Sequence, residues 1–552
     1  MNGFSLARFE SQTNVDITRK APLFLCKFEV GKLDSQSVDA RAQMLKLEKD
    51  GKNKIWTRVL KNSFAPLFMG KFQCVVGNPP WINWENLPEE YREMSSSLWS
   101  KYGLGVGPNA QQVGLGKRGR DMSMLFTYTC CDRYLADNGL LGFMITQMVF
   151  KTGGAAGFRR FKLSQDRMLK VAVVHDMVTL RPFESAANMT SMIILRKGEQ
   201  TTYPVPYVRW IKQKKGEIGD VTLADAMSVC SQEQLVAIPV DSKDKNSPWI
   251  TAKPHVVNIL NKIKGTSQYK AHAGVYTGGA NGVYWVKILE KKPSNLLVIE
   301  NRHDLGKKDL KKTVTEVEVD LVYRLVRSGD IEKWKYRSEN YVIVPHTKAT
   351  SWRAIDESTM KSNFPRTYSY LDGFREFLRN RPDYLLRRKR YPFYIMFNAH
   401  RISFMPYKVV WKRMASKMEA VVLHPIDDRD IGRKVPILQE TLSYIPLKVE
   451  NEAHFLCAIL NAVEINALVR SFSQMGGKSF ATPSILDQVR IPRYDPSDKT
   501  HRKLAELSKE AHSLASKSML TELEKTEIEI GKCVAELYQL SDREVEKLEA
   551  EV

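Results

Sequence analysis

The chain has 552 residues, a length typical of two or three domains. Its 84 lysines and arginines outnumber its 62 aspartates and glutamates, and the formal charge of +22 favours a polyanionic partner such as nucleic acid. A basic protein without such a partner is the alternative. Seven scattered cysteines without a C-x-x-C pair argue against a disulfide framework or a zinc site, and we expect no metal. No signal peptide or membrane span is visible, so we expect a cytoplasmic protein without a membrane partner.

In chain order, short apolar runs first alternate with amphipathic stretches, as in APLFLCKFEV, FQCVVGNPP, GLLGFMITQ and SMIILRK. This alternation predicts an α/β domain over residues 1–200, with helices packed on a largely parallel sheet. The polar, charge-mixed residues 201–248 predict an interdomain linker. Residues 249–498 combine short strands, aromatic residues and basic clusters, which predicts an α+β domain. Residues 499–552 have apolar residues at helical spacing and predict a helical tail.

The strand predicted over residues 72–76 ends abruptly at Asn78, Pro79, Pro80 and Trp81. Prolines fix φ and cannot continue a ladder, so the chain must leave the sheet there. Ligands bind at the carboxyl ends of strands in open α/β sheets, where Asn78 and Trp81 are therefore expected. The Asn78 side-chain oxygen and a proline-segment carbonyl could accept both hydrogens of an exocyclic amino group, and a base could stack on Trp81. The alternative is a strand stop without chemistry.

The segment VVGNPPWINWENLPEEYR resembles adenine-N6 DNA methyltransferases of the gamma class, especially type IIG restriction–modification enzymes with a C-terminal target-recognition domain. The resemblance implies a partial Rossmann-like domain over residues 1–200 that uses S-adenosyl-L-methionine (SAM), and a DNA target-recognition domain over residues 249–498. It also implies that an adenine is flipped out of double-stranded DNA and methylated, with Asn78, Pro79, Pro80 and Trp81 in the catalytic loop. The setting would be restriction–modification or phage defence.

Two later segments resemble further blocks of this family. DMSMLFTYTCCDRYLADNGLLGFMITQMVF is similar to the block beside the SAM pocket, which makes Asp121 a candidate cofactor contact. The alternative for Asp121 is an ordinary helix N-cap. VHDMVTLRPFESAANMTSMIILRK is similar to the block that holds the flipped adenine, so Phe183 would pack on the base opposite Trp81. The alternative for Phe183 is a place in the core.

The family's SAM-binding Gly-x-Gly turn should precede the catalytic loop, but the glycines before Gly77 are isolated: Gly3, Gly31, Gly51 and Gly70. The glycine-rich residues 102–110 have no convincing strand before them, and residues 274–286 resemble a turn of a recognition domain. We therefore expect the chain to begin inside the methyltransferase domain, with a second polypeptide supplying the turn. The alternative is a non-catalytic DNA-specificity subunit derived from such an enzyme. A third alternative is methylation of an RNA base or of a protein glutamine, because this loop also occurs in enzymes that act on those substrates.

The recognition half contributes mainly positive charge. The basic run Arg387, Arg388, Lys389 and Arg390 lies among aromatic residues, and we expect it to contact DNA phosphates. For the lysine-rich run at residues 307–312, a solvated surface is the favoured interpretation. No nuclease signature with paired carboxylates and a lysine is visible, so cleavage by this polypeptide alone is not expected.

Overall fold

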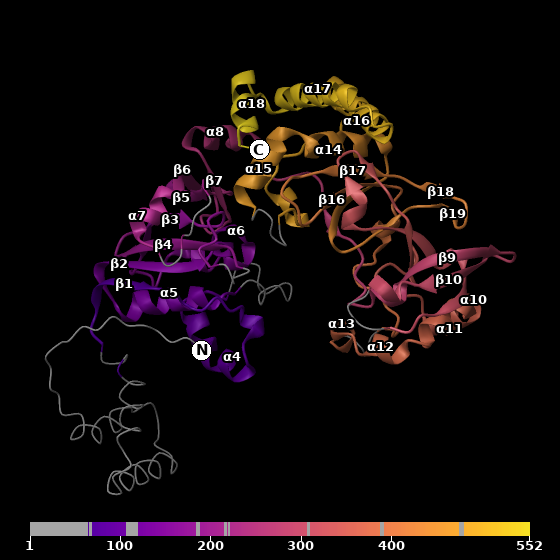
Figure 1. Cartoon of the computed structure of the whole chain (residues 1–552), viewed down its shortest axis with the longest axis horizontal. Coiled ribbons are helices and arrows are strands. Elements are labelled where there is room, and N and C mark those ends of the chain that lie inside the picture. Colours follow the sequence, from indigo (N-terminus) through magenta and orange to yellow (C-terminus); the bar gives the residue numbers. More distant parts are fainter. Residues whose placement is uncertain are drawn as a thin grey trace, which may run out of the picture. The chain divides into compact units, whose positions relative to one another are not determined.

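The computed structural model describes residues 65, 69–105, 120–183, 188–214, 218, 221–305, 310–386, 391–473 and 480–551. By its internal contacts the chain divides into two units, Met1–Lys71 and Phe72–Val552. All named elements belong to the second unit (Figure 1).

A seven-stranded sheet holds the first part of this unit, in the order β1-β2-β4-β3-β5-β6-β7. Its strands are β1 (Phe72–Gly77), β2 (Leu135–Thr146), β3 (Leu169–Asp176), β4 (Thr190–Lys197), β5 (Val205–Lys212), β6 (Cys230–Pro239) and β7 (Trp249–Ala252). The strand predicted over residues 72–76 is thus confirmed as β1.

The sheet is mixed, and the expectation of a largely parallel sheet is wrong. Only β1 with β2 and β3 with β5 run parallel, whereas the other four pairs are antiparallel. The reason lies in the connections. β3 leads into β4, and β6 leads into β7, without an intervening helix, and the short helix α7 (Leu223–Ser228) between β5 and β6 does not carry the chain across the sheet, because β6 returns antiparallel beside β5. The coarser expectation of an α/β fold with a large sheet and helices is confirmed.

The expected linker over residues 201–248 is also corrected. β5 and β6 lie inside that range, and both are interior strands of the seven-stranded sheet. β6 begins with the polar residues 231–234, of which Gln232 and Gln234 are exposed, so its composition resembles a loop although its backbone pairs with β5.

Helices of this part are α4 (Glu89–Lys101), α5 (Met122–Arg133), α6 (Met148–Lys151) and α7 (Leu223–Ser228), with short 3-10 turns at Trp84–Asn86, Gly153–Ala155 and Phe158–Arg160. α5 packs on β2, and a shared core contains Tyr128, Leu141 and Val174. Trp249 of β7 joins this core by stacking on Phe150, with ring centroids 4.8 Å apart.

The second half contains two further sheets. A six-stranded sheet has the order β11-β10-β9-β15-β12-β20, and a four-stranded sheet has the order β17-β16-β21-β8. The strands are β8 (His272–Ala273), β9 (Trp285–Lys292), β10 (Leu296–Asn301), β11 (Val314–Glu318), β12 (Val322–Val326), β15 (Asn340–Ile343), β16 (Tyr407–Lys412), β17 (Ala420–Leu423), β20 (Ile437–Leu438) and β21 (Leu442–Leu447). Two hairpins pair β13 (Ile331–Glu332) with β14 (Lys335–Tyr336) and β18 (Ile426–Asp428) with β19 (Gly432–Lys434).

Short helices accompany these sheets: α8 (Pro254–Ile263), α9 (Asn281–Tyr284), α10 (Glu357–Asn363), α11 (Pro365–Asp372), α12 (Arg375–Arg379) and α13 (Pro382–Leu385). The 3-10 turns of this half are at His303–Leu305, Val319–Leu321, Ser328–Asp330, Arg401–Phe404 and Pro483–Asp487.

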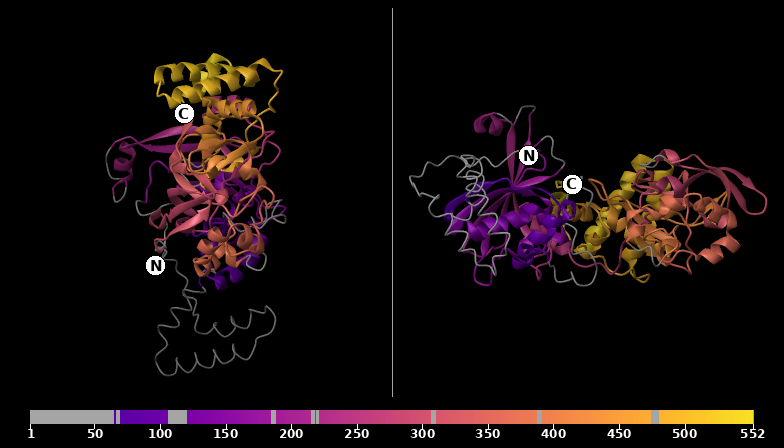
Figure 2. Two further views of the ribbon diagram at one scale, coloured as in Figure 1. Left: turned by 90° about the vertical axis from the view of Figure 1, so that its right-hand side faces the viewer. Right: turned by 90° about the horizontal axis from the view of Figure 1, so that it is seen from below.

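The C-terminal residues are helical, as their spacing predicted. After α14 (Glu450–Asn461) and α15 (Val463–Phe472) come α16 (Lys499–Ser516), α17 (Leu520–Tyr538) and α18 (Asp542–Glu549), seen together in Figure 2. The apolar faces of α16, α17 and α18 share one core with α8, α14 and β16. Tyr538 anchors α17, because its hydroxyl donates to the Arg490 carbonyl at 2.6 Å. The last helices are therefore packed elements and not a free tail.

In the described part of the chain, no single helix has the length and apolar character of a membrane span. α14 and α15 together, bent by 62°, reach it by length and composition alone.

Candidate active site at the carboxyl end of β1

The loop that follows β1 is fixed to two neighbouring elements. The Trp81 indole Nε1 donates to the Met144 carbonyl of β2 at 3.1 Å. Further along, Trp84 N donates to the Arg120 carbonyl at 2.8 Å, and Met122 N donates to the Ile82 carbonyl at 2.9 Å. The loop is thus tied to β2 and to the start of α5.

Within this anchored loop, Asn78 points outward. Pro79 is buried, Pro80 and Trp81 are half-buried, and the Asn78 side chain is exposed. It makes no hydrogen bond to any residue that the structure describes. An exposed amide with free acceptor capacity suits a ligand's amino group.

Phe183 lies beside Trp81, although the two come from different loops. Phe183 belongs to the connection between β3 and β4, and its ring centroid is 5.1 Å from that of Trp81 at an interplanar angle of 70°. A base sandwiched between two rings needs about 7 Å, because each stacked layer is separated by about 3.5 Å. The two rings therefore touch edge to face, and a base can enter only if they separate and turn.

A small cavity of about 120 Å³ lies between the two described ends of the connection from β3 to β4. Its lining residues are Met177, Val178, Arg181, Pro182, Phe183, Asn188, Met189 and Thr190. Phe183 therefore borders this cavity as well as the Trp81 ring.

Asp121 is the N-cap of α5. Its Oδ1 accepts a hydrogen bond from Ser123 N at 2.8 Å, and its Oδ2 lies 3.5 Å from the Thr146 hydroxyl. The side chain is buried, and this burial raises the pKa of Asp121, while the hydrogen bonds from Ser123 and Thr146 offset part of the effect. The helix-capping alternative is thus what the structure shows, and a cofactor contact by Asp121 stays a prediction.

A buried network holds the Phe183 loop and was not anticipated from the sequence. The Asp176 carboxylate at the end of β3 accepts from Gln147 Nε2 and from the Tyr207 hydroxyl, both at 2.8 Å, and from Val178 N at 3.0 Å. The Gln147 backbone N–H donates to the Met189 carbonyl at the far end of the loop. Asp176 and Gln147 therefore fix both ends of the segment that presents Phe183.

Lys151 connects this region to a later part of the same unit. Its ammonium donates to the Thr251 hydroxyl at 2.8 Å, to the Trp249 carbonyl at 3.2 Å and to the Ser471 carbonyl at 2.7 Å. The side chain is buried, none of its hydrogen-bond partners among the described residues is a carboxylate, and burial lowers the pKa of Lys151 to about 7.

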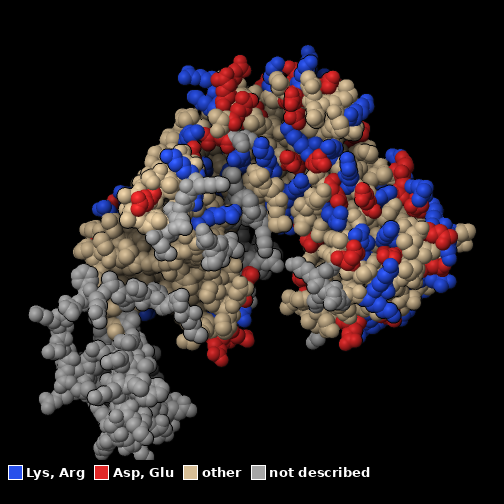
Figure 3. Space-filling model, in the orientation of Figure 1, with Lys and Arg blue, Asp and Glu red and all other residues tan. Residues whose placement is uncertain are grey.

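The basic run from Arg387 to Arg390 lies outside the described residues. Just before it, Arg381 is buried and donates to the carbonyls of Thr277, Leu378 and Phe393 at 2.7 to 2.9 Å. Arg381 is thus a structural cation. On the face shown in Figure 3, lysine and arginine side chains lie among aspartates and glutamates.

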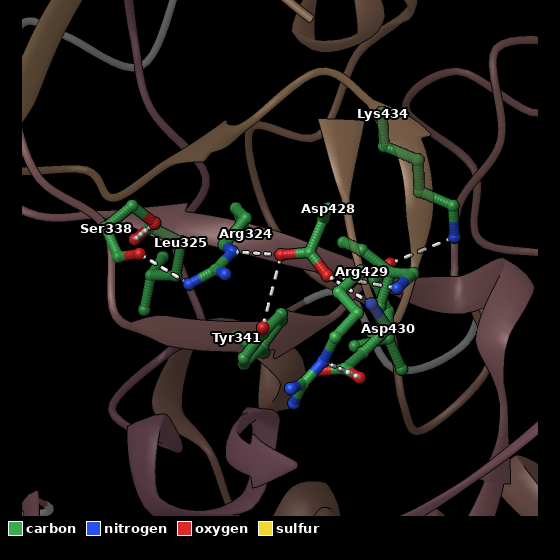
Figure 4. A network of polar contacts seen from close by, with 10 residues as sticks. Arg324, Leu325, Ser338, Tyr341, Asp428, Arg429, Asp430 and Lys434 are labelled. Carbon is green, nitrogen blue, oxygen red and sulfur yellow. Dashed lines mark hydrogen bonds and ion pairs between the residues drawn. The ribbon is translucent and has the colours of Figure 1, made fainter. Parts of the chain in front are cut away.

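An internal charge network also stabilises the second half (Figure 4). Asp428 pairs with Arg324 Nε, accepts from the Tyr341 hydroxyl at 3.2 Å, and accepts from Asp430 N and Ile431 N at 2.8 and 3.1 Å. Burial alone would raise the pKa of Asp428, but these hydrogen bonds and the Arg324 charge lower it overall. This network joins β12, β15 and the β18–β19 hairpin.

The fold and the site together define a class of protein. Its members have an α/β domain in which an Asn-Pro-Pro-aromatic loop follows the carboxyl end of a strand. Residues 10–177 match the family model described as Eco57I restriction-modification methylase. The resemblance to restriction–modification methylases is therefore confirmed for this part of the chain. A search of curated proteins found no match.

Among solved structures, the Type IIL restriction-modification enzyme MmeI in complex with DNA is 12% identical, with a TM-score of 0.48, over 87% of this chain and 56% of that one. The type IIG restriction endonuclease BpuSI is 12% identical, with a TM-score of 0.27, over 85% of this chain and 55% of that one. The DNA-bound Type ISP enzyme LlaBIII is 10% identical, with a TM-score of 0.37, over 80% of this chain and 30% of that one. This chain thus spans about half the length of MmeI and BpuSI, and likenesses this distant carry no functional argument.

Proposed function

We propose that this chain is the catalytic and recognition part of a SAM-dependent adenine-N6 DNA methyltransferase in a restriction–modification or phage-defence system. The methylase match over residues 10–177 supports the reaction class. The observation that carries the finer proposal is the juxtaposition of an exposed Asn78 side chain with the Trp81 and Phe183 rings.

In this proposal the chain's own residues hold the target base. The Asn78 side-chain oxygen and the Pro79 carbonyl accept the two hydrogens of the adenine amino group, so the nitrogen lone pair stays directed outward. Trp81 and Phe183 separate and hold the extruded base between them, which offsets part of its unstacking cost. The residues contribute positioning more than a strong base.

SAM, when bound, supplies an electrophilic methyl group. The described residues do not form a cradle for it, because both Asp121 oxygens are engaged by Ser123 and Thr146 and no Gly-x-Gly turn precedes Asn78. We therefore assign the cofactor turn to a second polypeptide. The basic residues 387–390 would contact the phosphates of double-stranded DNA.

The reaction is tested by incubating this chain, alone and with the neighbouring gene product, with SAM and mixed-sequence duplex DNA. The DNA is then digested to nucleosides and analysed by mass spectrometry. N6-methyladenine as the product supports the proposal, whereas a methylated cytosine contradicts it. RNA given in parallel tests the RNA alternative.

The second candidate is a non-catalytic DNA-specificity subunit, favoured by the isolated glycines before Gly77. It predicts sequence-specific DNA binding that Asn78→Ala leaves unchanged, and no methylated nucleoside under any of these conditions.

A further inference from the structure

Trp352 is an exposed aromatic residue in the connection from β15 to α10. It is 45% exposed, and its ring meets the Tyr391 ring edge to face, with centroids 5.8 Å apart. The Arg353 guanidinium lies 4.8 Å from the centroid of the same Trp352 ring. Single apolar residues are common on protein surfaces, so exposure alone would have no functional meaning. Two further features of this connection distinguish Trp352 from such residues.

The first feature is the support of the loop that carries Trp352. His346 is fully buried, its Nδ1–H donates to the Ser351 carbonyl at 3.0 Å, and its Nε2 accepts from Met396 N at 3.1 Å. Burial lowers the pKa of His346 to about 4, so the imidazole is neutral at pH 7 and fills both roles. Ser351 has a φ of 51°, a left-handed conformation that a serine adopts only when its surroundings enforce it. The residue before Trp352 is therefore held in one conformation.

The same serine joins this loop to the 3-10 turn Arg401–Phe404. The Ser351 hydroxyl oxygen accepts from Arg401 N at 3.1 Å. Lys348, Arg353 and Arg401 thus belong to one pair of connected loops, and all three residues are exposed. Side chains presented from supported loops lose less freedom on binding than side chains of a mobile segment, so such a pair of loops suits recognition.

The second feature is the charge of these two loops. Lys348, Arg353 and Arg401 form no ion pair with any carboxylate that the structure describes. Other exposed cations of this half do so, as Arg433 does with Asp427 at 2.9 Å. Cations without a carboxylate partner can bind phosphates without first giving up an ion pair, which favours a polyanionic ligand at these loops.

We propose that the two loops form a contact surface for double-stranded DNA, in which the three cations bind phosphates and the Trp352 indole packs against the bases as an apolar wedge. The inference rests on the proposed function, because it names residues by which the recognition half would hold its DNA substrate. DNA presents a dense row of phosphates together with apolar base faces, so it matches both kinds of side chain that these loops bring together. The surface is additional to the basic residues 387–390.

The surface is tested by measuring DNA affinity at several salt concentrations. The full chain, without SAM, is titrated into a fluorescein-labelled DNA duplex of mixed sequence, and fluorescence anisotropy reports binding. Trp352→Ala removes the wedge, and Arg401→Ala removes one phosphate contact. Leu289→Ala is the matched control for Trp352, because Leu289 on β9 is 46% exposed, and Arg433→Ala is the control for Arg401. Urea unfolding is used to check that each variant is folded.

Arg401→Ala should weaken binding and reduce the slope of log affinity against log salt concentration by about 0.9, the value for one phosphate contact. Trp352→Ala should weaken binding at least about fivefold and leave this slope unchanged, because an apolar contact releases no counterion. Trp352→Phe keeps an aromatic ring and should restore most of the affinity. Both control variants should bind DNA like the unmodified chain.

The proposal is overturned if Trp352→Ala and Arg401→Ala bind DNA like their controls, if the two variants change the salt slope alike, or if the chain binds an RNA duplex of the same sequence more tightly than DNA. The expected changes in DNA binding without any formation of N6-methyladenine would overturn the proposed function but not this surface. Methyl transfer that Trp352→Ala leaves unchanged at subsaturating DNA would overturn the surface but not the proposed function.

Discussion

Trp81 and Phe183 meet edge to face, with ring centroids 5.1 Å apart and planes at 70°. Trp81 is held by its hydrogen bond to the Met144 carbonyl, whereas the Phe183 side chain borders a small cavity and makes no such bond to the residues that the structure describes. Opening the site for a base should therefore move Phe183 and leave Trp81 in place.

Phe183→Ala tests the stacking role. Loss of one stacking face costs about 1–3 kcal/mol, so methyl transfer efficiency should fall by about one to two orders of magnitude. Fluorescence of 2-aminopurine at the target position reports extrusion of the base and should change less in the variant. Tyr91→Ala removes a 62% exposed aromatic ring of α4 and serves as the control. Equal activity of the two variants would show that Phe183 does not hold the base.

Asp176→Asn tests the support of the Phe183 loop. An amide in this place would present its NH2 group either toward the two donors of Gln147 and Tyr207 or toward Val178 N, so at least one buried hydrogen bond is lost, at about 1–3 kcal/mol of unfolding free energy. The 2-aminopurine signal should fall together with kcat/KM. Tyr207→Phe removes one of these bonds and should show a smaller effect of the same kind. A variant that is less stable but has an unchanged fluorescence signal would limit Asp176 to a structural role.

Lys151 should make the free energy of unfolding depend on pH above about pH 7. Its pKa is about 7 in the folded chain and 10.5 in the ordinary case, so the unfolded chain binds more protons between these values. The free energy of unfolding should therefore rise with pH in this window, by up to about 1.4 kcal/mol per pH unit from this group. Below pH 7 Lys151 is protonated in both states, so this pH dependence vanishes and the destabilising effect of the buried charge stays constant. Urea unfolding at pH 7, 8, 9 and 10 should show a flatter profile for Lys151→Met.

Lys408 offers an independent comparison, because burial also lowers the pKa of Lys408 to about 7. Lys408→Met should flatten the same profile, and the double variant should flatten it further. Parallel pH profiles for the unmodified chain and both variants would contradict these assignments.

Asp428→Asn should weaken the second half. The buried carboxylate loses a charged pair with Arg324, and hydrogen bonds to charged groups contribute about 1.5–3 kcal/mol. Because the folded-state pKa is lowered, this stability is present above the ordinary aspartate pKa and is lost as pH falls through the folded value. Denaturant unfolding at pH 7 should show the difference, and at strongly acidic pH the variant and the unmodified chain should converge.

Asp427→Asn is the matched control for Asp428. Its ion pair with Arg433 is exposed on both sides, so the expected loss is under about 1 kcal/mol. If Asp427→Asn lowers the free energy of unfolding as much as Asp428→Asn does, burial of the ion pair does not determine how much it stabilises the chain.

Local signals in the sequence predicted local structure. Pro79 and Pro80 marked the end of β1, and Asp121 marked the start of α5, because strand termination and helix capping involve residues a few positions apart. The helices after residue 499 followed from their apolar spacing. The chemical role of Asn78, binding of an amino group, remains a prediction.

Long-range pairing could not be predicted in the same way. β6 begins with polar residues and acquires strand structure only by pairing with β5 and β7, so its segment resembled a linker. Asp176 was overlooked because its partners Gln147 and Tyr207 are distant in the sequence. Local composition does not predict which strands become neighbours. The orientation of Phe183 against Trp81 depends on the same tertiary packing.

The most direct test of the account is transfer of a radioactive methyl group from SAM to duplex DNA by this chain, alone and together with the proposed second polypeptide, comparing Asn78→Ala with Asn83→Ala. Both asparagines are exposed in the same loop, and Asn83 caps its short turn without a side-chain hydrogen bond. The account predicts that Asn78→Ala abolishes transfer while DNA binding and the activity of Asn83→Ala persist. Full activity of Asn78→Ala would contradict it.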